Sequence, residues 1–86
     1  MRIRTDGVVT RRVGEDLMVL DLKSSQYFSV GGTGAFILDL LGERDVSQEE
    51  VVEALMAQYV VDVERATADV AAFVTRLDQA GLLLTS

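Results

Sequence analysis

The chain of 86 residues is long enough for one small domain with a thin core, and 49% of its residues are hydrophobic. It has no cysteine and no histidine, which excludes disulfides, thiolate metal sites and the commonest general base, and its net charge is −6. We therefore expect a single domain over residues 1–86 that is not an enzyme and uses no metal or cofactor. No signal sequence or membrane span is visible, so a cytoplasmic location with no membrane partner is expected.

Three short strands are predicted in the first 30 residues. They are runs of β-branched, aliphatic and aromatic residues with connections short enough for hairpins, at residues 8–13, 17–22 and 26–30. The second strand is apolar on both faces, with Leu17 and Val19 on one face and Met18, Leu20 and Leu22 on the other. A sheet of this kind requires cover on both sides, or a partner.

Between the third strand and the next segment lies the glycine-rich stretch "SVGGTGAF". A phosphate-binding loop requires a lysine after its glycines, and none is present. The dinucleotide fingerprint requires a third glycine where Ile37 stands. We therefore interpret the stretch as a corner, in which Gly31 and Gly32 adopt positive φ angles and Thr33 caps the helix that follows.

Three helices are predicted in the rest of the chain, at residues 33–42, 47–59 and 63–80. Ser47 and Glu50 fit a capping box, Asp62 is a suitable N-cap, and Gly42 and Gly81 are expected to end the first and third helices. The expected buried positions are Phe36, Ile37, Leu40 and Leu41, then Val51, Val52, Leu55 and Met56, then Ala66, Val70, Phe73, Val74 and Leu77. This order predicts an α+β fold, a three-stranded antiparallel sheet followed by three helices, similar to a winged helix-turn-helix.

The distribution of charge argues against nucleic-acid binding. Residues 47–58 contain three acidic residues and no basic one, and the third helix with its cap contains four acidic and two basic residues. Binding to phosphates gains its electrostatic free energy from lysine and arginine. The arginines near the N-terminus are interpreted as exposed positions of an edge strand, namely Arg2, Arg4, Arg11 and Arg12. A winged-helix regulator of transcription is kept as an alternative function.

The third strand, residues 26–30, is predicted to be an open sheet edge. It carries Tyr27 and Phe28 but no charged residue, so another strand could pair with it. If the third helix lies nearby, strand and helix would frame a groove for an extended peptide. The candidate peptide-binding residues are Gln26, Tyr27, Phe28, Ser29, Val30, Asp69, Ala72, Phe73, Arg76 and Leu77. A structural subunit that pairs with itself through this edge is a further alternative.

The pattern "VLDLKSSQYFSVGGTGAFILDLL" and the helices after it resemble the PqqD family, over about residues 8–84. The family typically has an aliphatic-Asp-aliphatic strand, a "YF" strand, an "LNxTGxxIW"-like turn and helix, and a last helix ending in "L..GLL". The matching residues are Asp21, Tyr27, Phe28, Thr33, Gly34, Ile37, Leu77, Gly81 and Leu82. The chain departs from the pattern at "VGG", where Leu-Asn is usual, and at Leu38, where Trp is common.

This resemblance implies a precursor-peptide recognition element without catalysis of its own. Such a domain binds the leader of a ribosomally synthesised precursor as an added strand on the third strand, beside the third helix. The implied partners are that leader and a leader-cleaving cysteine protease or other peptide-modifying enzyme, with lasso peptide biosynthesis favoured. The alternative within the family is a peptide chaperone for a radical SAM enzyme, as in quinone-cofactor biosynthesis.

Overall fold

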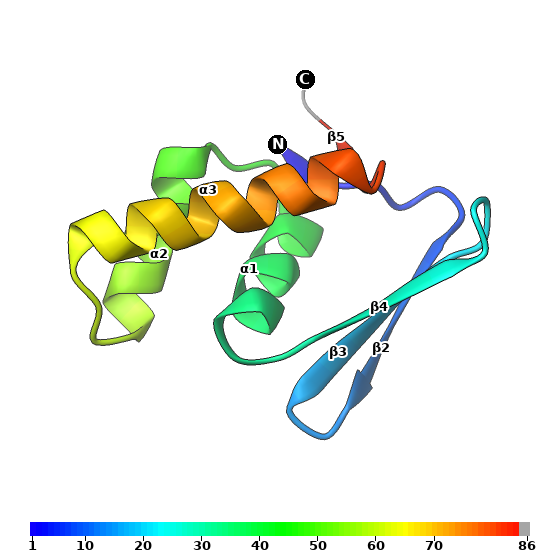
Figure 1. The fold of residues 1–86 in the computed structure, drawn as a ribbon, viewed down its shortest axis with the longest axis horizontal. Helices are drawn as coiled ribbons and strands as arrows, with labels where there is room; N and C mark the ends of the chain where they lie inside the picture. The colour runs from blue at the N-terminus through cyan, green and yellow to red at the C-terminus, as the bar shows by residue number, and fades with distance from the viewer. Residues whose placement is uncertain (85–86) are drawn as a thin grey trace.

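The computed structural model describes residues 1–84 and confirms the predicted fold class (Figure 1). A three-stranded antiparallel sheet precedes three helices, and a short two-stranded sheet joins the two ends of the described chain. The elements are β1 (Arg2–Ile3), β2 (Val8–Val13), β3 (Asp16–Asp21), β4 (Gln26–Val30), α1 (Gly32–Glu43), α2 (Gln48–Gln58), α3 (Val63–Gln79) and β5 (Leu83–Leu84).

The main sheet has the order β2-β3-β4, so β2 and β4 are its two edges. The small sheet pairs Arg2 with Leu84 and Ile3 with Leu83. β1 and β5 were not predicted from the sequence, because two residues are too few to show an alternating pattern. Their pairing places the start of the chain beside the segment that follows α3 (Figure 1).

The helix ends follow the expected caps, except in α1. The capping box is present: the Ser47 Oγ accepts a hydrogen bond from the Glu50 N–H at 3.1 Å, and the Glu50 carboxylate accepts one from the Ser47 N–H at 3.0 Å. Asp62 caps α3 by accepting a bond from the Arg65 N–H at 2.8 Å. Gly81, with φ of 74°, follows the end of α3 as expected. α1 instead runs to Glu43, one residue beyond the predicted stop.

The glycine corner differs from its prediction in two ways. Gly32 has the positive φ that was expected, at 57°, but Gly31 is extended with φ of −131°. Gly31 is also the N-cap of α1, without a side-chain cap, so Thr33 lies inside the helix and does not cap it. A Cβ at position 31 would lie 2.5 Å from the Asp16 Oδ1, so a larger residue there would force the exposed Asp16 side chain to move.

The buried core lies between the helices and the inner face of the sheet. Its members are Ile3, Leu17, Val19, Ala35, Ile37, Leu38, Leu41, Val46, Val51, Val52, Leu55, Ala66, Val70, Leu77 and Leu82. The predicted helix positions Phe36, Leu40, Phe73 and Val74 are half-buried and pack against this core.

Met56 was expected in the core but is 38% exposed. Each residue of an α-helix is turned by about 100° from the one before, so Leu55, Val52 and Met56 lie about 40°, 100° and 140° from Val51. Exposure rises in that order, from 0% at Val51 through 2% and 9% to 38%. The buried stripe of α2 is therefore narrower than predicted, and Met56 lies beyond its edge.

Only one face of the main sheet is covered by the helices. The inward residues Leu17 and Val19 are 6% and 1% exposed, whereas the outward Leu20 is 40% exposed. β3 spans residues 16–21 and not the predicted 17–22, so Leu22, which is 58% exposed, follows the strand. Met18, also on the outer face, is half-buried. The sheet is apolar on both faces, and the residues that the structure describes leave its outer face open.

A buried ion pair fastens the segment after β1 to the main sheet. Asp21 is 2% exposed, and its Oδ1 lies 2.6 Å from Arg4 Nη2 and accepts a hydrogen bond from the Lys23 N–H. The Arg4 side chain is only 20% exposed, so its assignment to an exposed edge was wrong. Burial alone would raise the pKa of Asp21, but hydrogen bonds from Ser24 and Lys23 and the charge of Arg4 together hold that pKa below its ordinary value.

Candidate functional site

The hydrogen-bonding direction of β4 follows from the turn that joins β2 to β3. Val13 pairs with Asp16 across a two-residue loop, and the first loop residue, Gly14, has φ of 63°. In such a hairpin the closing pair exchanges both backbone hydrogen bonds, and bonded pairs then alternate along the ladder. The backbone groups of even-numbered β3 residues therefore face β2. The Leu22 N–H follows the same rule, because it donates to the Gly7 carbonyl at 2.8 Å.

It follows that the odd-numbered residues of β3 bond to β4. These residues are Leu17, Val19 and Asp21, and their partners on β4 are Val30, Phe28 and Gln26. The intervening residues of β4, Tyr27 and Ser29, consequently direct their N–H and C=O groups away from β3, toward the open side of the sheet. A strand added at this edge would form its backbone hydrogen bonds with Tyr27 and Ser29.

A groove runs between this edge and α3, and it consists of two adjoining cavities. The wider cavity, about 380 Å³, is lined by Ser29, Val30, Gly31, Thr33, Gly34, Ile37, Asp69, Ala72, Phe73 and Arg76. The smaller cavity, about 50 Å³ and mostly apolar, is lined by Val19, Phe28, Val30, Leu38, Phe73, Arg76, Leu77, Ala80 and Leu82. Val30, Phe73 and Arg76 line both cavities, so we call them together the β4–α3 groove.

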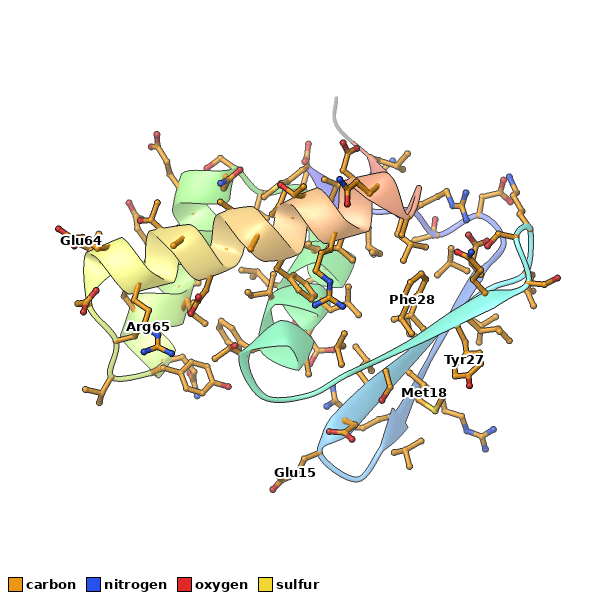
Figure 2. The ribbon with its side chains drawn as sticks, viewed as in Figure 1. Glu15, Met18, Tyr27, Phe28, Glu64 and Arg65 are labelled. Carbon is orange, nitrogen blue, oxygen red and sulfur yellow. The ribbon has the colours of Figure 1, made fainter. Side chains whose placement is uncertain are left out.

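The structure brings eight of the ten candidate residues to the β4–α3 groove. These are Phe28, Ser29, Val30, Asp69, Ala72, Phe73, Arg76 and Leu77. Gln26 and Tyr27 line neither cavity. Figure 2 shows Phe28 on the side of the sheet that faces the helices and Tyr27 on the opposite side, where it is 69% exposed. Tyr27 therefore contributes its backbone to the open edge and its side chain to the outer face.

The start of α1 and the corner before it also line the groove, which was not predicted from the sequence. Gly31, Thr33, Gly34 and Ile37 form the end of the wider cavity, because the corner after β4 carries the chain back past α3. Three of them, Thr33, Gly34 and Ile37, belong to the pattern that carries the family resemblance. That pattern was the signal in the sequence that pointed to them.

Two charged residues lie at the groove with different surroundings. Asp69 is 3.8 Å from Arg65, one turn earlier on α3. Within residues 1–84, Arg76 forms no ion pair, although it lines both cavities. A guanidinium without a carboxylate partner is suited to bind a carboxylate of an incoming peptide.

The opposite edge of the sheet is built differently. On β2, Arg12 forms an ion pair with Asp39 of α1, with 2.6 Å between Nη2 and Oδ2. The pair connects the edge strand to a helix, and charged edge residues discourage pairing with another strand. Of the two edges of the main sheet, β4 is therefore the one whose residues leave it open to a further strand.

The outer face of the sheet forms a second exposed apolar surface. Val9, Leu20 and Tyr27 are cross-strand neighbours in register, and they are 49%, 40% and 69% exposed. With Arg11 and Met18 they line a shallow hollow. We call these five residues the outer apolar patch. It borders β4, so a strand added to β4 would extend it.

Within the described residues, no three histidine, cysteine or acidic side chains gather as a metal site, and no helix is long and apolar enough to cross a membrane. The side chains of the groove include carboxylate, hydroxyl and guanidinium groups but no histidine or cysteine, because the sequence contains neither. The arrangement is that of a peptide-binding groove beside an open strand.

Comparison with known proteins identifies the class of this domain. The family model described as Coenzyme PQQ synthesis protein D (PqqD) matches residues 16–83, and the chain belongs to this family. Among curated proteins, none matches the chain.

Two solved structures share the fold over essentially the whole chain. One is TbiB1 in complex with the TbiA(beta) leader peptide, with a TM-score of 0.86 and 30% sequence identity, covering 100% of this chain and 99% of that chain. The other is lasso peptide synthetase B1 complexed with the leader peptide, with a TM-score of 0.82 and 28% identity, covering 98% of this chain and 96% of that chain. Both similar proteins thus bind leader peptides.

Proposed function

We propose that this protein binds the leader region of a ribosomally synthesised precursor peptide, in lasso peptide biosynthesis. The observation that carries the proposal is the open β4 edge beside an apolar groove, in a fold that matches two leader-bound proteins, one of them a lasso peptide synthetase B1, over 98–100% of this chain. The leader adds as a strand to β4, with its backbone bonded to Tyr27 and Ser29. Its inward side chains then enter the β4–α3 groove, and its outward side chains lie beside the outer apolar patch.

The groove favours side-chain anchors as the main source of affinity. Each backbone hydrogen bond of an added strand contributes about 0.5–1.5 kcal/mol net. Each buried apolar anchor contributes about 1.5–3 kcal/mol before ordering costs are deducted. Phe28 and Phe73 offer large apolar surfaces on the two sides of the smaller cavity. The anchors therefore set affinity and specificity, and the β4 backbone sets the register.

The protein acts on its peptide by delivery, without catalysis. A sequence with neither histidine nor cysteine lacks the commonest general base and the strongest nucleophile. The proposed partner that completes the reaction is a leader-cleaving cysteine protease or another peptide-modifying enzyme. Since precursor peptides are made on ribosomes, we expect the protein to work in the cytoplasm, and we propose no nucleic-acid or membrane partner for it.

The outer apolar patch supports a partner of this kind. It combines exposed apolar side chains with Arg11, which forms no ion pair within residues 1–84. An enzyme that docks there would contact the sheet and the outward side chains of the bound leader at once. Contact with both would let the enzyme distinguish the loaded from the empty protein.

A second candidate function is supported by the family match itself, whose description is that of a coenzyme PQQ synthesis protein. In that case the protein is a peptide chaperone for a radical SAM enzyme, and the same groove binds a different precursor. The two functions differ in the precursor and in the enzyme that acts on it.

The test is a titration with a synthetic, fluorescein-labelled peptide that covers the leader of the precursor encoded beside this gene. We expect saturable 1:1 binding, and no binding of a peptide with the same composition in scrambled order. Equal binding of both peptides would reject specific leader recognition. Neighbouring genes for a protease and a cyclase support the lasso pathway, whereas a radical SAM enzyme in their place supports the chaperone.

A further inference from the structure

Gly34 lies in α1, at a place where its backbone does not require glycine. Gly32 and Gly81 have positive φ angles, which favour glycine, but Gly34 does not. A glycine inside a helix destabilises it relative to alanine, because glycine loses more conformational freedom on folding. A residue that is costly in the helix and unneeded by the backbone indicates that a neighbouring group approaches closely.

The neighbouring group is the ring of Phe73. A Cβ placed on Gly34 would lie 3.3 Å from the Phe73 Cε1, 3.7 Å from its Cζ and 3.6 Å from the Val30 Cβ. The first of these distances is shorter than an ordinary carbon–carbon contact of about 3.5–4.0 Å. The ring therefore extends from α3 to the backbone of α1, and a Cβ at position 34 would require it to move by a few tenths of an ångström.

This contact fixes the position of Phe73 in the β4–α3 groove. Phe73 lines both cavities, as Val30 and Arg76 do, so its ring forms part of the wall that they share. On one side lies the wider cavity at Thr33 and Ala72, and on the other lies the smaller apolar cavity at Phe28 and Leu77. A ring displaced from Gly34 moves toward these cavities, which are the spaces proposed for the side chains of the peptide.

We propose that Gly34 is a positioning residue of the leader site: its missing side chain seats the Phe73 ring against α1 and keeps the groove open. The inference rests on the proposed leader binding and adds a residue that determines its affinity. A methyl group at position 34 pushes the half-buried ring into the groove. The helix tolerates the methyl group, since Phe73 borders open space and can yield.

The test compares Gly34→Ala with Gly42→Ala, a matched control in the same helix. A Cβ at Gly42 meets only the Ile3 Cγ2, at an ordinary 3.9 Å, and Gly42 does not line the β4–α3 groove. Both substitutions replace a helical glycine whose φ is not positive. We expect both variants to unfold thermally at or above the wild-type midpoint.

The two variants should differ in binding the labelled leader peptide. We expect the Kd of Gly34→Ala to rise about tenfold, since overpacking a fitted site typically costs on that order, and the Kd of Gly42→Ala to stay unchanged. In a Phe73→Leu background, the further change caused by Gly34→Ala should shrink to within about twofold, because the smaller side chain leaves room for the methyl group.

Three results would overturn the inference while wild-type binding stands: an unchanged Kd for Gly34→Ala, an equal loss in Gly42→Ala, or an equal effect of Gly34→Ala with and without Phe73. Unfolding of Gly34→Ala would overturn it as well, because the ring would then be unable to yield. Failure of the wild-type protein to bind the leader peptide is a separate outcome, which rejects the proposed function itself.

Discussion

Proline substitution at the two edges of the main sheet tests whether β4 is the edge to which the leader adds. The Ser29 N–H faces away from β3, so proline there removes a donor that the folded domain does not use. One lost hydrogen bond costs about 0.5–1.5 kcal/mol. That cost corresponds to about a 2- to 13-fold loss of affinity. The proline ring also occupies space beside the added strand, so we expect the loss from Ser29→Pro to reach at least the upper end of this range.

Two further proline variants make the comparison specific. Phe28→Pro removes an N–H that bonds within the sheet to β3, and it also removes a half-buried ring from the core, so it should lower the thermal midpoint strongly. Thr10→Pro is the matched control, because Thr10 directs its N–H to the free side of the other edge strand, β2. It should fold and bind the leader peptide with the wild-type Kd.

The measurements are fluorescence anisotropy with the labelled leader peptide and thermal unfolding followed by circular dichroism. Each 1 kcal/mol of lost stability lowers the midpoint of a domain of this size by about 4–8 °C, so a variant that merely unfolds is recognised at once. If Ser29→Pro remains folded and binds as tightly as Thr10→Pro and the wild type, the leader does not add to β4.

Three other outcomes are expected. Phe73→Ala should weaken leader binding far more than Arg76→Ala, since an exposed ion pair contributes at most about 1 kcal/mol. Only Arg76→Ala should reduce the salt dependence of Kd, measured by titrations at low and high salt. Equal salt dependence in Arg76→Ala and the wild type would contradict the assignment of Arg76. The stability that Asp21 contributes is present above its ordinary pKa of 3.8 and is lost as the pH falls through the lower pKa of the folded state. Urea midpoints should therefore fall more below about pH 4 in the wild type than in Asp21→Asn, which keeps only the loss due to other carboxyls with lowered pKa values, such as Asp6, Asp45 and Glu50; parallel curves for the two proteins would argue against it. Incubated alone with its precursor, the purified protein should leave the peptide's mass unchanged, and mass spectrometry that detects steady cleavage or modification would refute a purely binding role.

Local signals in the sequence determined most of the elements and their ends. Each helix-end signal depends on residues within a few positions of one another, so it can be recognised from the sequence alone. These signals are the capping box at Ser47 and Glu50, the N-cap at Asp62 and the glycine after α3. The three main strands followed from their composition and their short connections. The absence of charge on β4, together with the family pattern, was enough to identify this edge as the candidate site.

The tertiary structure decided what depends on contacts between distant segments. The pairing of β1 with β5 joins Arg2 to Leu84 and Ile3 to Leu83, from opposite ends of the described chain. Likewise, the burial of Arg4 against Asp21 depends on where the N-terminal segment lies. Periodicity alone gave α2 too wide a buried stripe, because the width depends on the helices packed against it.

The β4–α3 groove was also predicted in part from the sequence, and the rest was decided by the tertiary structure. The sequence identified a strand and a helix as its two sides, and eight of the ten candidate residues lie there. It did not determine which face of β4 points inward, and it assigned Gln26 and Tyr27 with the rest. The register of β4 on β3 decides which of its side chains point inward. Val19 pairs with Phe28, so Phe28 shares the inner face with buried Val19. Tyr27 pairs with Leu20 and shares the outer face with it. Side chains of a strand alternate between two faces, and only packing against the helices decides which face is covered.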